Sequence, residues 1–326
     1  MMETAQTALV ALWQEGFGSG SRLWPLYLLS TLLIAFVIHR RRRVDAAFLA
    51  WLMPRTIWTH PSHLVDIKLF VFSKLLSVIG LFQIVAVAAG LASLVADLFP
   101  VRPAAPPPHP LVVAALLLIV GDFATYWVHR IHHEMRVLWP FHAVHHSAEV
   151  MTPITAYRKH PVYDLTKTLV HGTLLGLLQG CLVGLFAGGV GVGLLMGVNA
   201  GYFLFNMLGS NFRHSHVHLG YGRVLEHLLI SPAQHQIHHS IAPEHHNRNY
   251  GEVLAIWDWI FGTLCLSRSE ERLEFGLGDR LGARVPQPHD SLAAALILPL
   301  RDSVKQLRKL FRGESRTAKH PVTPAE

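Results

Sequence analysis

Long apolar runs separated by short polar stretches dominate the first two thirds of the chain. A helix needs ~17–25 mostly apolar residues to cross a hydrocarbon core about 30 Å thick. The runs that meet this requirement are 23–39, which only just does so, 75–95, 111–128 and 165–208, which is long enough for two helices. The prolines of PVRPAAPPPHP (100–110) fix φ and lack an N–H, so they predict a stiff loop between the second and third runs. The pattern predicts an all-α, multi-pass integral membrane helical bundle.

Glycines recur at every fourth position of the last apolar run. Small residues at i and i+4 form a flat stripe that lets helix backbones approach closely in lipid. The run therefore predicts two tightly packed membrane helices, and the pattern leaves open whether they pack on each other or across a homodimer. The glycines fall in two registers, which are Gly172, Gly176, Gly180, Gly184 and Gly188, followed by Gly189, Gly193, Gly197 and Gly201.

Composition supports the same class of protein. Of the 326 residues, 51% are hydrophobic and only 15% are charged, whereas a soluble domain carries about a quarter of charged residues. The formal net charge of +7 does not indicate a nucleic-acid partner, because no basic face interleaved with aromatic residues is apparent. The only cysteines, Cys181 and Cys265, exclude a disulfide framework and an iron–sulfur cluster, which needs a full set of thiolates. Any electrons that the protein uses must come from another molecule.

Histidine is concentrated at the ends of the predicted spans and at helical spacing. The stretch HRIHHEMRVLWPFHAVHH (129–146) follows directly on an apolar run, and six of its eighteen residues are histidine. Residues at i, i+3 and i+4 lie on one face of a helix. Because burying so many imidazoles without partners is costly, metal ions are the partners that we expect. The sets at this spacing are His129 and His133; His142, His145 and His146; His214 and His218; and His235, His238 and His239.

The number and type of these residues indicate two metals. Neutral imidazole binds zinc, copper, iron and nickel, and a catalytic zinc usually takes only three protein ligands, so the set is too large for one zinc. The Glu-x-x-His pairs of carboxylate di-iron bundles are missing from the sequence. The HExxH motif of zinc proteases is missing too, because Val137 stands where its second histidine would be. An all-imidazole, two-metal site beside the bilayer remains.

Basic residues give the orientation of the predicted spans. Four arginines, 40–43, follow the first span, and Lys and Arg are in excess at the cytoplasmic ends of membrane helices. Alternating the spans from that point puts residues 129–164 and 210–326 in the cytoplasm. We therefore expect every histidine motif on the cytoplasmic face, as a single site requires.

Three stretches resemble the fatty acid hydroxylase and sterol desaturase superfamily. They are DFATYWVHRIHHEMRVLWPFHAVHHS (122–147), FRHSHVH (212–218) and SPAQHQIHHSIAPEHHNRNYGEVLAIWDWIFGT (231–263), and they occur in the family's order. The resemblance covers roughly 110–265 and implies an integral-membrane enzyme with a histidine-bound di-iron centre. The iron ligands that it implies are His129, His133, His142, His145, His146, His214, His218, His235, His238 and His239.

The resemblance implies a non-haem di-iron oxygenase. Such an enzyme would hydroxylate or desaturate a membrane lipid, using dioxygen and a separate electron-transfer protein, and zinc can replace iron in purified protein. A zinc-dependent membrane hydrolase, in which bound water is the reagent, is the alternative. A metal transporter would place its ligands near the bilayer midplane, and a haem carrier would leave most of these histidines unused.

Four residues near the motifs need separate interpretation. His132 and His216 are extra to the family pattern, and His160 is a weaker ligand candidate. Asp122 lies inside the third span, where an ionisable group is costly and usually functional. It is seven residues before His129, roughly 10 Å along a helix, so we expect it to orient a ligand histidine. A structural bond to Tyr126 or to a neighbouring helix is the alternative.

The resemblance also divides the chain. We expect membrane anchor spans and their flanks in 1–110, the catalytic domain in 111–285, and an amphipathic helix with a disordered tail in 286–326. That helix would either lie on anionic lipid headgroups or pack on the cytosolic domain. Its apolar face is formed by Leu300, Val304, Leu307 and Phe311, and its basic residues are Lys305, Arg308, Lys309 and Arg312.

Overall fold

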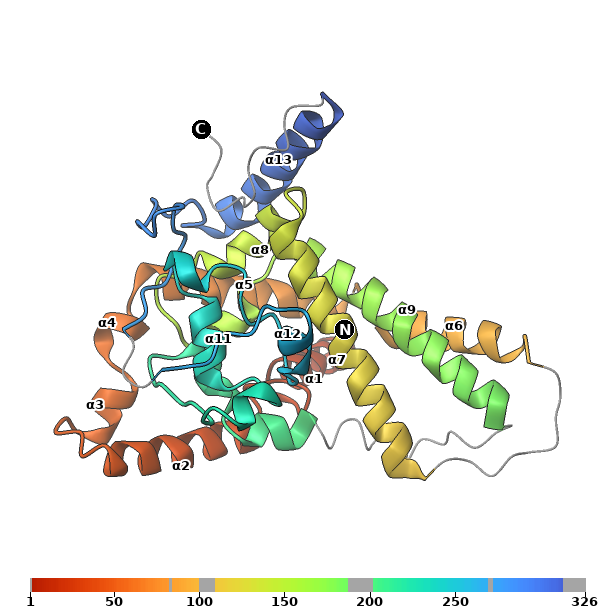
Figure 1. Cartoon of the computed structure of the whole chain (residues 1–326), viewed down its shortest axis with the longest axis horizontal. Helices are drawn as coiled ribbons and strands as arrows, with labels where there is room; N and C mark the ends of the chain where they lie inside the picture. Colours follow the sequence, from red (N-terminus) through yellow and green to blue (C-terminus); the bar gives the residue numbers. More distant parts are fainter. Residues whose placement is uncertain (1, 82–83, 100–108, 187–201, 269–271, 313–326) are drawn as a thin grey trace.

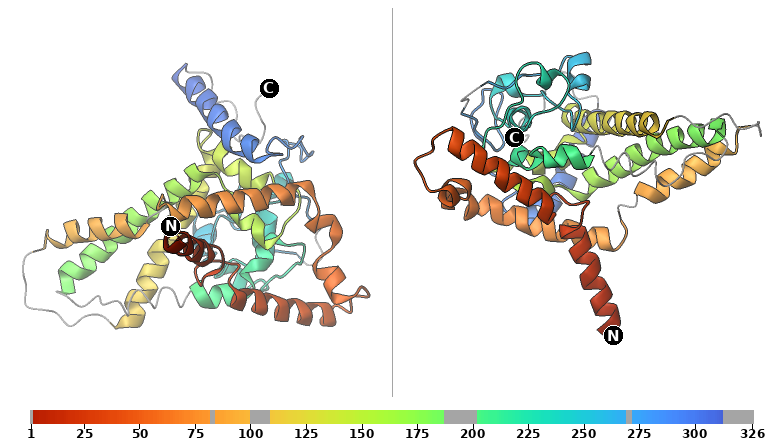
Figure 2. Two further views of the ribbon diagram at one scale, coloured as in Figure 1. Left: turned by 180° about the vertical axis from the view of Figure 1, so that it is seen from behind. Right: turned by 90° about the horizontal axis from the view of Figure 1, so that it is seen from below.

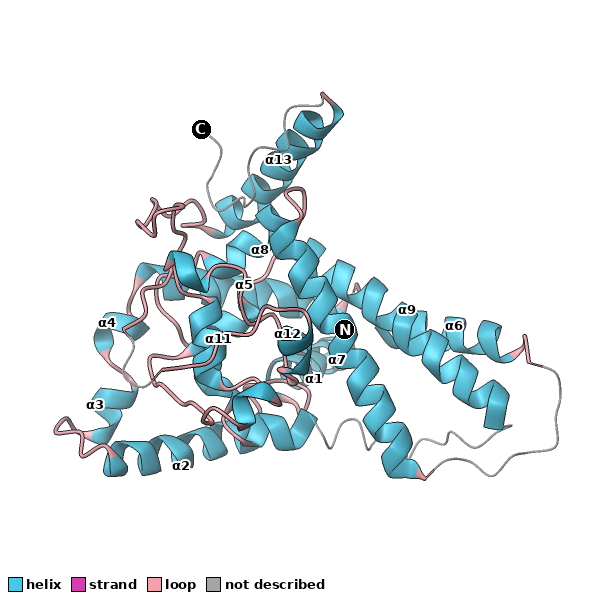
Figure 3. Ribbon diagram, viewed as in Figure 1, coloured by secondary structure: helices cyan, strands magenta, loops and turns pink. Residues whose placement is uncertain are grey.

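The computed structural model of the chain describes residues 2–81, 84–99, 109–186, 202–268 and 272–312. Within these ranges the chain consists of helices and connecting loops, with isolated bridges but no strand (Figures 1 and 3). The prediction of a helical protein is confirmed for this part of the chain. The described helices include α1 (Met2–Phe17), α3 (Phe48–Leu52), α4 (Arg55–Trp58), η1 (Pro153–Tyr157), η3 (Leu225–His227), η4 (Pro243–His245) and α12 (Ile256–Ile260).

Two of the described helices are long and apolar enough to cross a membrane. They are α7 (Pro110–Glu134) and α9 (Pro161–Phe186). Both extend to the same side of the histidine-bearing region, and α6 (Ile84–Ala96) runs along α9 (Figures 1 and 2). Leu111 on α7 is 72% exposed and Leu169 on α9 is 51% exposed. Apolar surface of this kind suits contact with lipid.

The apolar run 75–95, predicted as one span, is divided between two helices. α5 (Pro61–Val78) ends just before Gly80, whose φ of 81° lies in the left-handed region that glycine adopts readily. The next helix, α6, begins at Ile84. The prediction of one continuous helix is therefore wrong, because hydropathy counts apolar residues and does not register a left-handed backbone turn. The first predicted span corresponds to α2 (Pro25–Arg41).

The glycine face of α9 lies against α6. A Cβ added to Gly176 would lie 2.8 Å from the carbonyl oxygen of Ala88. The close approach that the glycine spacing predicts thus takes place between these two helices. Gly188 of the first register, the whole second glycine register (189–201) and most of the proline-rich stretch (100–108) lie outside the described residues.

A buried ion pair fixes α8 (Trp139–His146), which carries three of the predicted ligands. Nη1 of Arg158 lies 2.8 Å from Oδ1 of Asp66 on α5, and both side chains are fully buried. Arg158 also donates to the carbonyl oxygens of Val144 on α8 (2.7 Å) and of His289 (3.0 Å). Losing one partner of a buried ion pair costs about 3–5 kcal/mol, so this arginine holds α5, α8 and the segment before α13 together.

The helix expected near the C-terminus is α13 (Leu292–Phe311). One side packs on α8 and α5, where Ala295 and Pro299 are buried. Val304 and Phe311 face away from this contact and are 47% and 85% exposed. The helix therefore has a packed side and an exposed apolar side. The tail expected to be disordered, 313–326, lies outside the described residues.

Candidate metal centre

Nine of the ten predicted ligand histidines come together in two buried groups. Within each group, one ring nitrogen of every histidine lies within 4.8 Å of the others. No member is more than 8% exposed. The first group is His129, His133, His142, His146 and His238, and the second group is His145, His214, His235 and His239.

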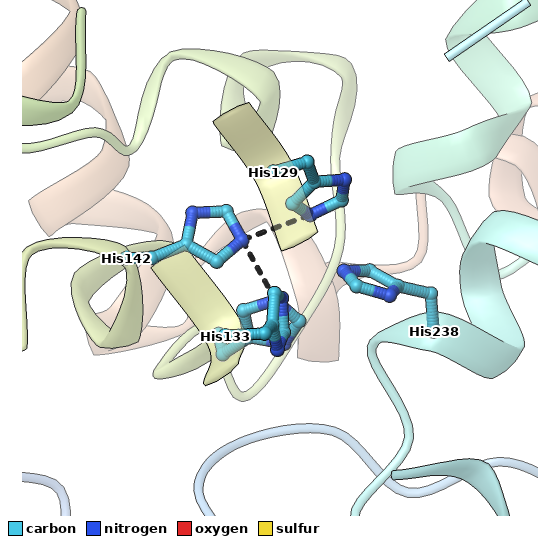
Figure 4. A group of neighbouring side chains, drawn as sticks. His129, His133, His142 and His238 are labelled. Atoms are coloured by element: carbon cyan, nitrogen blue, oxygen red, sulfur yellow. Dashed lines mark hydrogen bonds between the residues drawn. The ribbon is translucent and has the colours of Figure 1, made fainter. Parts of the chain in front are cut away.

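Four helical segments supply these side chains. The cytoplasmic end expected for α7 carries His129 and His133, and η2 (Ser210–His214) ends at His214. α8 and α11 (Pro232–His238) each contribute to both groups, so the two groups adjoin across these helices. Figure 4 shows His142 and His238 facing the α7 histidines from opposite sides. Histidines more than 100 positions apart in the sequence thus form one site.

α8 and α11 begin with similar local signals. Each has a proline in its first turn, where the missing N–H costs nothing. Ser231 caps α11 by accepting from the Gln234 backbone N–H, and the Gln234 side chain accepts from the Ser231 N–H. α8 has no side-chain cap, so the proline marks its start, whereas the Ser231–Gln234 capping box fixes the start of α11 and hence the direction of the histidines that follow.

Nitrogen–nitrogen distances within the groups match those of ligands to one ion. Two nitrogens bound at ~2.1 Å to the same metal lie about 3.0–3.4 Å apart in octahedral or tetrahedral geometry. In the first group, Nε2 of His142 lies 3.0 Å from Nε2 of His129 and 3.2 Å from Nε2 of His146. In the second group, Nε2 of His214 lies 3.3 Å from Nε2 of His145 and 3.1 Å from Nε2 of His235.

Further imidazole nitrogens have no other partner within the described residues. Nε2 of His133 and Nε2 of His238 are buried without a hydrogen bond there. A buried polar atom without a partner costs about 1–3 kcal/mol. Hydrogen bonds between rings cannot satisfy the whole first group, since a neutral imidazole carries one proton. The donor set therefore fits two metal ions.

Backbone carbonyls orient two of these rings. Nδ1 of His129 donates to the carbonyl oxygen of Tyr250 (2.8 Å), and Nδ1 of His238 donates to that of Arg248 (2.7 Å). Each bond leaves Nε2 directed at the site and fixes the ring, as partners of metal-binding histidines commonly do. Sequence reasoning missed these two supports, because a main-chain carbonyl leaves no signal in the residue type.

Hydrogen bonds of the Asn249 and Asp258 side chains fix the segment 248–251 in position. Asn249 has a φ of 56° and its side chain bonds to both the N–H and the carbonyl of Cys265. The Asp258 carboxylate accepts from the N–H groups of Tyr250 and Gly251, each at 2.8 Å. Asn249 and Asp258 thus hold in place the segment whose Arg248 and Tyr250 carbonyls orient the two rings.

Residues 114–263 match the fatty acid hydroxylase family, and all nine histidines of the two groups lie within that range. This region of the chain matches the fatty acid hydroxylase and sterol desaturase superfamily. The resemblance drawn from the three histidine motifs is confirmed.

Two kinds of superfamily protein are similar to the chain. Alkylglycerol monooxygenase of Homo sapiens is 31% identical over 156 residues, which are 48% of this chain and 31% of the relative. The same enzyme of Danio rerio is 29% identical over 161 residues, or 49% and 32% of the two chains. Ornithine lipid hydroxylase of Rhizobium tropici is 32% identical over 149 residues, or 45% and 40%. The chain spans well under half the length of these relatives, and no solved structure matches it.

Burial keeps the imidazoles of the superfamily motifs neutral, which is the form that binds metal. Burial, and next the neighbouring imidazoles, lowers the pKa of His145, His146 and His239 well below the ordinary value of 6.5. Burial also lowers the pKa of His238 to about 4, although its bond to the Arg248 carbonyl opposes the shift. The apo site thus stays unprotonated in mildly acidic solution.

Asp122 acts on the segment that supports His129 rather than on a ligand ring. Its carboxylate accepts from the N–H groups of Val253 (2.9 Å) and Leu254 (3.0 Å) and from Nε1 of Trp257 (3.1 Å). These residues follow Tyr250, whose carbonyl oxygen accepts the hydrogen bond from Nδ1 of His129. A bond to a ligand histidine or to Tyr126 is not among its hydrogen bonds within the described residues, whereas the bond to Trp257 on α12 is the alternative contact with a neighbouring helix.

The structure places the other candidate histidines outside the two groups. The carbonyl oxygen of His218 accepts from Arg42 (2.9 Å). Nδ1 of His132 bonds to the Val128 carbonyl oxygen (2.7 Å). His160 accepts from the N–H of Val162 at the start of α9 and bonds to the Leu296 carbonyl oxygen, and His216 bonds to the Trp51 carbonyl oxygen.

Proposed function

We propose that this protein is a membrane-bound non-haem di-iron oxygenase that hydroxylates or desaturates a membrane lipid. The observation that carries the proposal is the pair of adjoining, buried all-imidazole groups within the family region. Relatives named as an alkylglycerol monooxygenase and an ornithine lipid hydroxylase support a lipid as substrate and dioxygen as oxidant.

The first group would hold one iron and the second group the other. Bound iron would activate dioxygen, because dioxygen must be activated before an unactivated C–H bond can be attacked. The chain's own residues keep the rings neutral by burial and direct Nε2 of His129 and His238 through the Tyr250 and Arg248 carbonyls. Asp122 would act as a positioning residue for the Tyr250 segment.

The alternative function, a zinc-dependent membrane hydrolase, is supported less well than the oxygenase. Five imidazoles in the first group exceed the four ligands that zinc usually takes. The curated relatives are named for oxygenation rather than hydrolysis. Zinc bound to the purified protein would still be expected, since imidazole is a good zinc ligand.

Electrons would come from a separate protein. The chain has only two cysteines, Cys181 and Cys265, which are too few for a thiolate-bound iron–sulfur cluster. A homodimer through the glycine-rich helices would have to use residues 188–201, because α6 already occupies the glycine face of α9.

We further propose the division into anchors (1–110), catalytic domain (111–285) and C-terminal helix and tail (286–326).

The test combines metal analysis with lipid profiling. Protein made with iron available should contain two irons per chain, and its lipid product should gain one oxygen or lose two hydrogens. Turnover should stop when the reductant and electron carrier are omitted. Two zincs without iron, or sustained turnover without any reductant, would contradict the proposal.

A further inference from the structure

A cavity beside both histidine groups carries a surplus of positive charge. It has a volume of about 180 Å³, and its lining includes histidines of both groups. Four cations and one carboxylate line it as well, which leaves a formal charge of +3 from these five side chains. They are Arg22, Lys159, Lys167, Arg213 and Glu252, and they come from separate parts of the chain.

The single negative charge of Glu252 does not balance the four cations. Its Oε1 lies 3.3 Å from Nη2 of Arg22, and its Oε2 lies 3.1 Å from Nζ of Lys167. Arg213 reaches only the main-chain carbonyl of Glu252. Lys159 has no carboxylate within salt-bridge distance among the described residues, and Asp164 and Glu252 act on it only from a longer range.

Two of the arginine nitrogens are buried without a hydrogen bond in the described part of the chain. They are Nη1 of Arg22 and Nε of Arg213. Arg213 is only 1% exposed, and its guanidinium lies 4.5 Å above the centroid of the Phe205 ring. Buried cations are normally paired, so these donors are arranged for an anion that the chain does not itself provide.

A larger cavity with aromatic side chains in its lining adjoins the cationic one. It has a volume of about 790 Å³ and shares Arg22 and Glu252 with the smaller, inner cavity. Polar residues form part of its lining, and the apolar part consists mainly of aromatic side chains that include Trp24, Tyr27 and Phe203. A charged chamber next to an aromatic one is complementary to an amphiphile. Arginine pairs, moreover, recognise phosphate and carboxylate oxygens through two parallel hydrogen bonds.

We propose that the inner cavity binds the anionic headgroup of the lipid substrate, a phosphate or carboxylate, through Arg22, Lys159, Lys167 and Arg213. The inference rests on the proposed lipid oxygenase function and narrows its substrate to the anionic lipids. Neutral and zwitterionic lipids of the same chain length would bind less well, because they leave the surplus charge uncompensated.

Lipid binding to the purified, metal-loaded full chain tests this directly. Native mass spectrometry would compare phosphatidylglycerol, phosphatidylcholine and diacylglycerol with identical acyl chains, and inorganic phosphate in a separate arm. We expect phosphatidylglycerol to be retained roughly tenfold better than the other two lipids, since one charged hydrogen bond accounts for about that factor. Inorganic phosphate should compete only weakly, because it lacks the apolar part that fills the outer cavity.

Variants at one lysine separate charge from structure. Lys167→Gln should lose most of the preference, and Lys167→Arg should keep it. Lys68→Gln, an exposed lysine on α5, serves as the matched control and should behave as wild type. Iron content should be unchanged in all three variants, which shows that each one folds.

The outcomes of the two proposals can be told apart. A protein that oxidises lipids but shows no charge preference, or whose Lys167→Gln variant keeps the full preference, would overturn the headgroup inference alone. Inorganic phosphate that binds as well as the anionic lipid would do the same. A protein that prefers anionic lipids but oxidises none of them would leave the headgroup site standing and contradict the oxygenase.

Discussion

At the residue scale, helical spacing explains why so many ligand candidates meet. A helix fixes residues at i, i+3 and i+4 on one face, so α8 could be expected to present its histidines together. The same spacing failed at His214 and His218. η2 ends at His214, and Ser215 is extended with φ −157° and ψ 169°, so the i+4 relation does not hold. Spacing predicts proximity only where the helix continues.

A pair of histidine substitutions tests the assignment of ligands. His239 belongs to the second group, whose four rings lie within ligand distance. His239→Ala should abolish activity and lower the metal content, because three imidazoles remain where four stood. His216→Ala is the control, since His216 is exposed and outside both groups although it is close to His214 in sequence. Metal-to-protein ratios of the two purified variants give the answer, and a full metal complement in His239→Ala would show the assigned coordination to be wrong.

The lowered histidine pKa values predict how acid affects the metal-free protein. Burial lowers the pKa of His238 to about 4, whereas an unfolded histidine titrates near 6.5. Between these values the unfolded chain binds more protons than the folded chain, so stability falls as the pH decreases from about 6.5 to about 4. Thermal unfolding of apo protein at pH 7, 5.5 and 4.5 should show a progressive decrease in Tm. A Tm that stays constant over this window would contradict the burial of neutral rings.

At the scale of elements, the sequence indicates helices better than it indicates their partners. α7 and α9 follow from their apolar runs, and α6 is shorter than predicted because of the turn at Gly80. The glycine stripe predicted a close helix contact, but small residues do not identify which helix makes that contact. That α6 is the neighbour depends on the path of the whole chain.

Filling the glycine stripe should separate α6 from α9. A Cβ at Gly180 would lie 2.8 Å from the Ala92 carbonyl oxygen, so Gly180→Leu forces the helices apart and should destabilise the protein by about 1–3 kcal/mol. Gly90→Ala on α6 is the matched control, because a Cβ there meets nothing within 4 Å. Thermal denaturation in detergent compares the variants. Equal melting of Gly180→Leu and wild type would show that this contact contributes little.

At the scale of the whole molecule, the site is formed by segments that are distant in sequence. The prediction that all histidine motifs lie on one face of a membrane implied that α7, α8, η2 and α11 meet in one region. The division into a group of five and a group of four was not predictable, because it depends on the relative orientation of α8 and α11. The buried Arg158–Asp66 pair, which contributes to that orientation, joins residues 92 positions apart.

Membrane orientation is the remaining expectation at this scale, and cysteine labelling tests it. The arginines at 40–43 end α2, and positive residues favour the cytoplasmic side, so the histidine face should be cytoplasmic and the loop before α7 outside. With Cys181 and Cys265 replaced by alanine, single cysteines would be introduced for Ala104 in that loop and for the exposed Glu244 near the histidine groups. An impermeant thiol reagent applied to intact cells should label position 104 and leave position 244 unlabelled until the membrane is permeabilised. Equal labelling of both positions in intact cells would mean that the loop and the histidine face share one side, and the alternation of spans that unites the motifs would have to be abandoned.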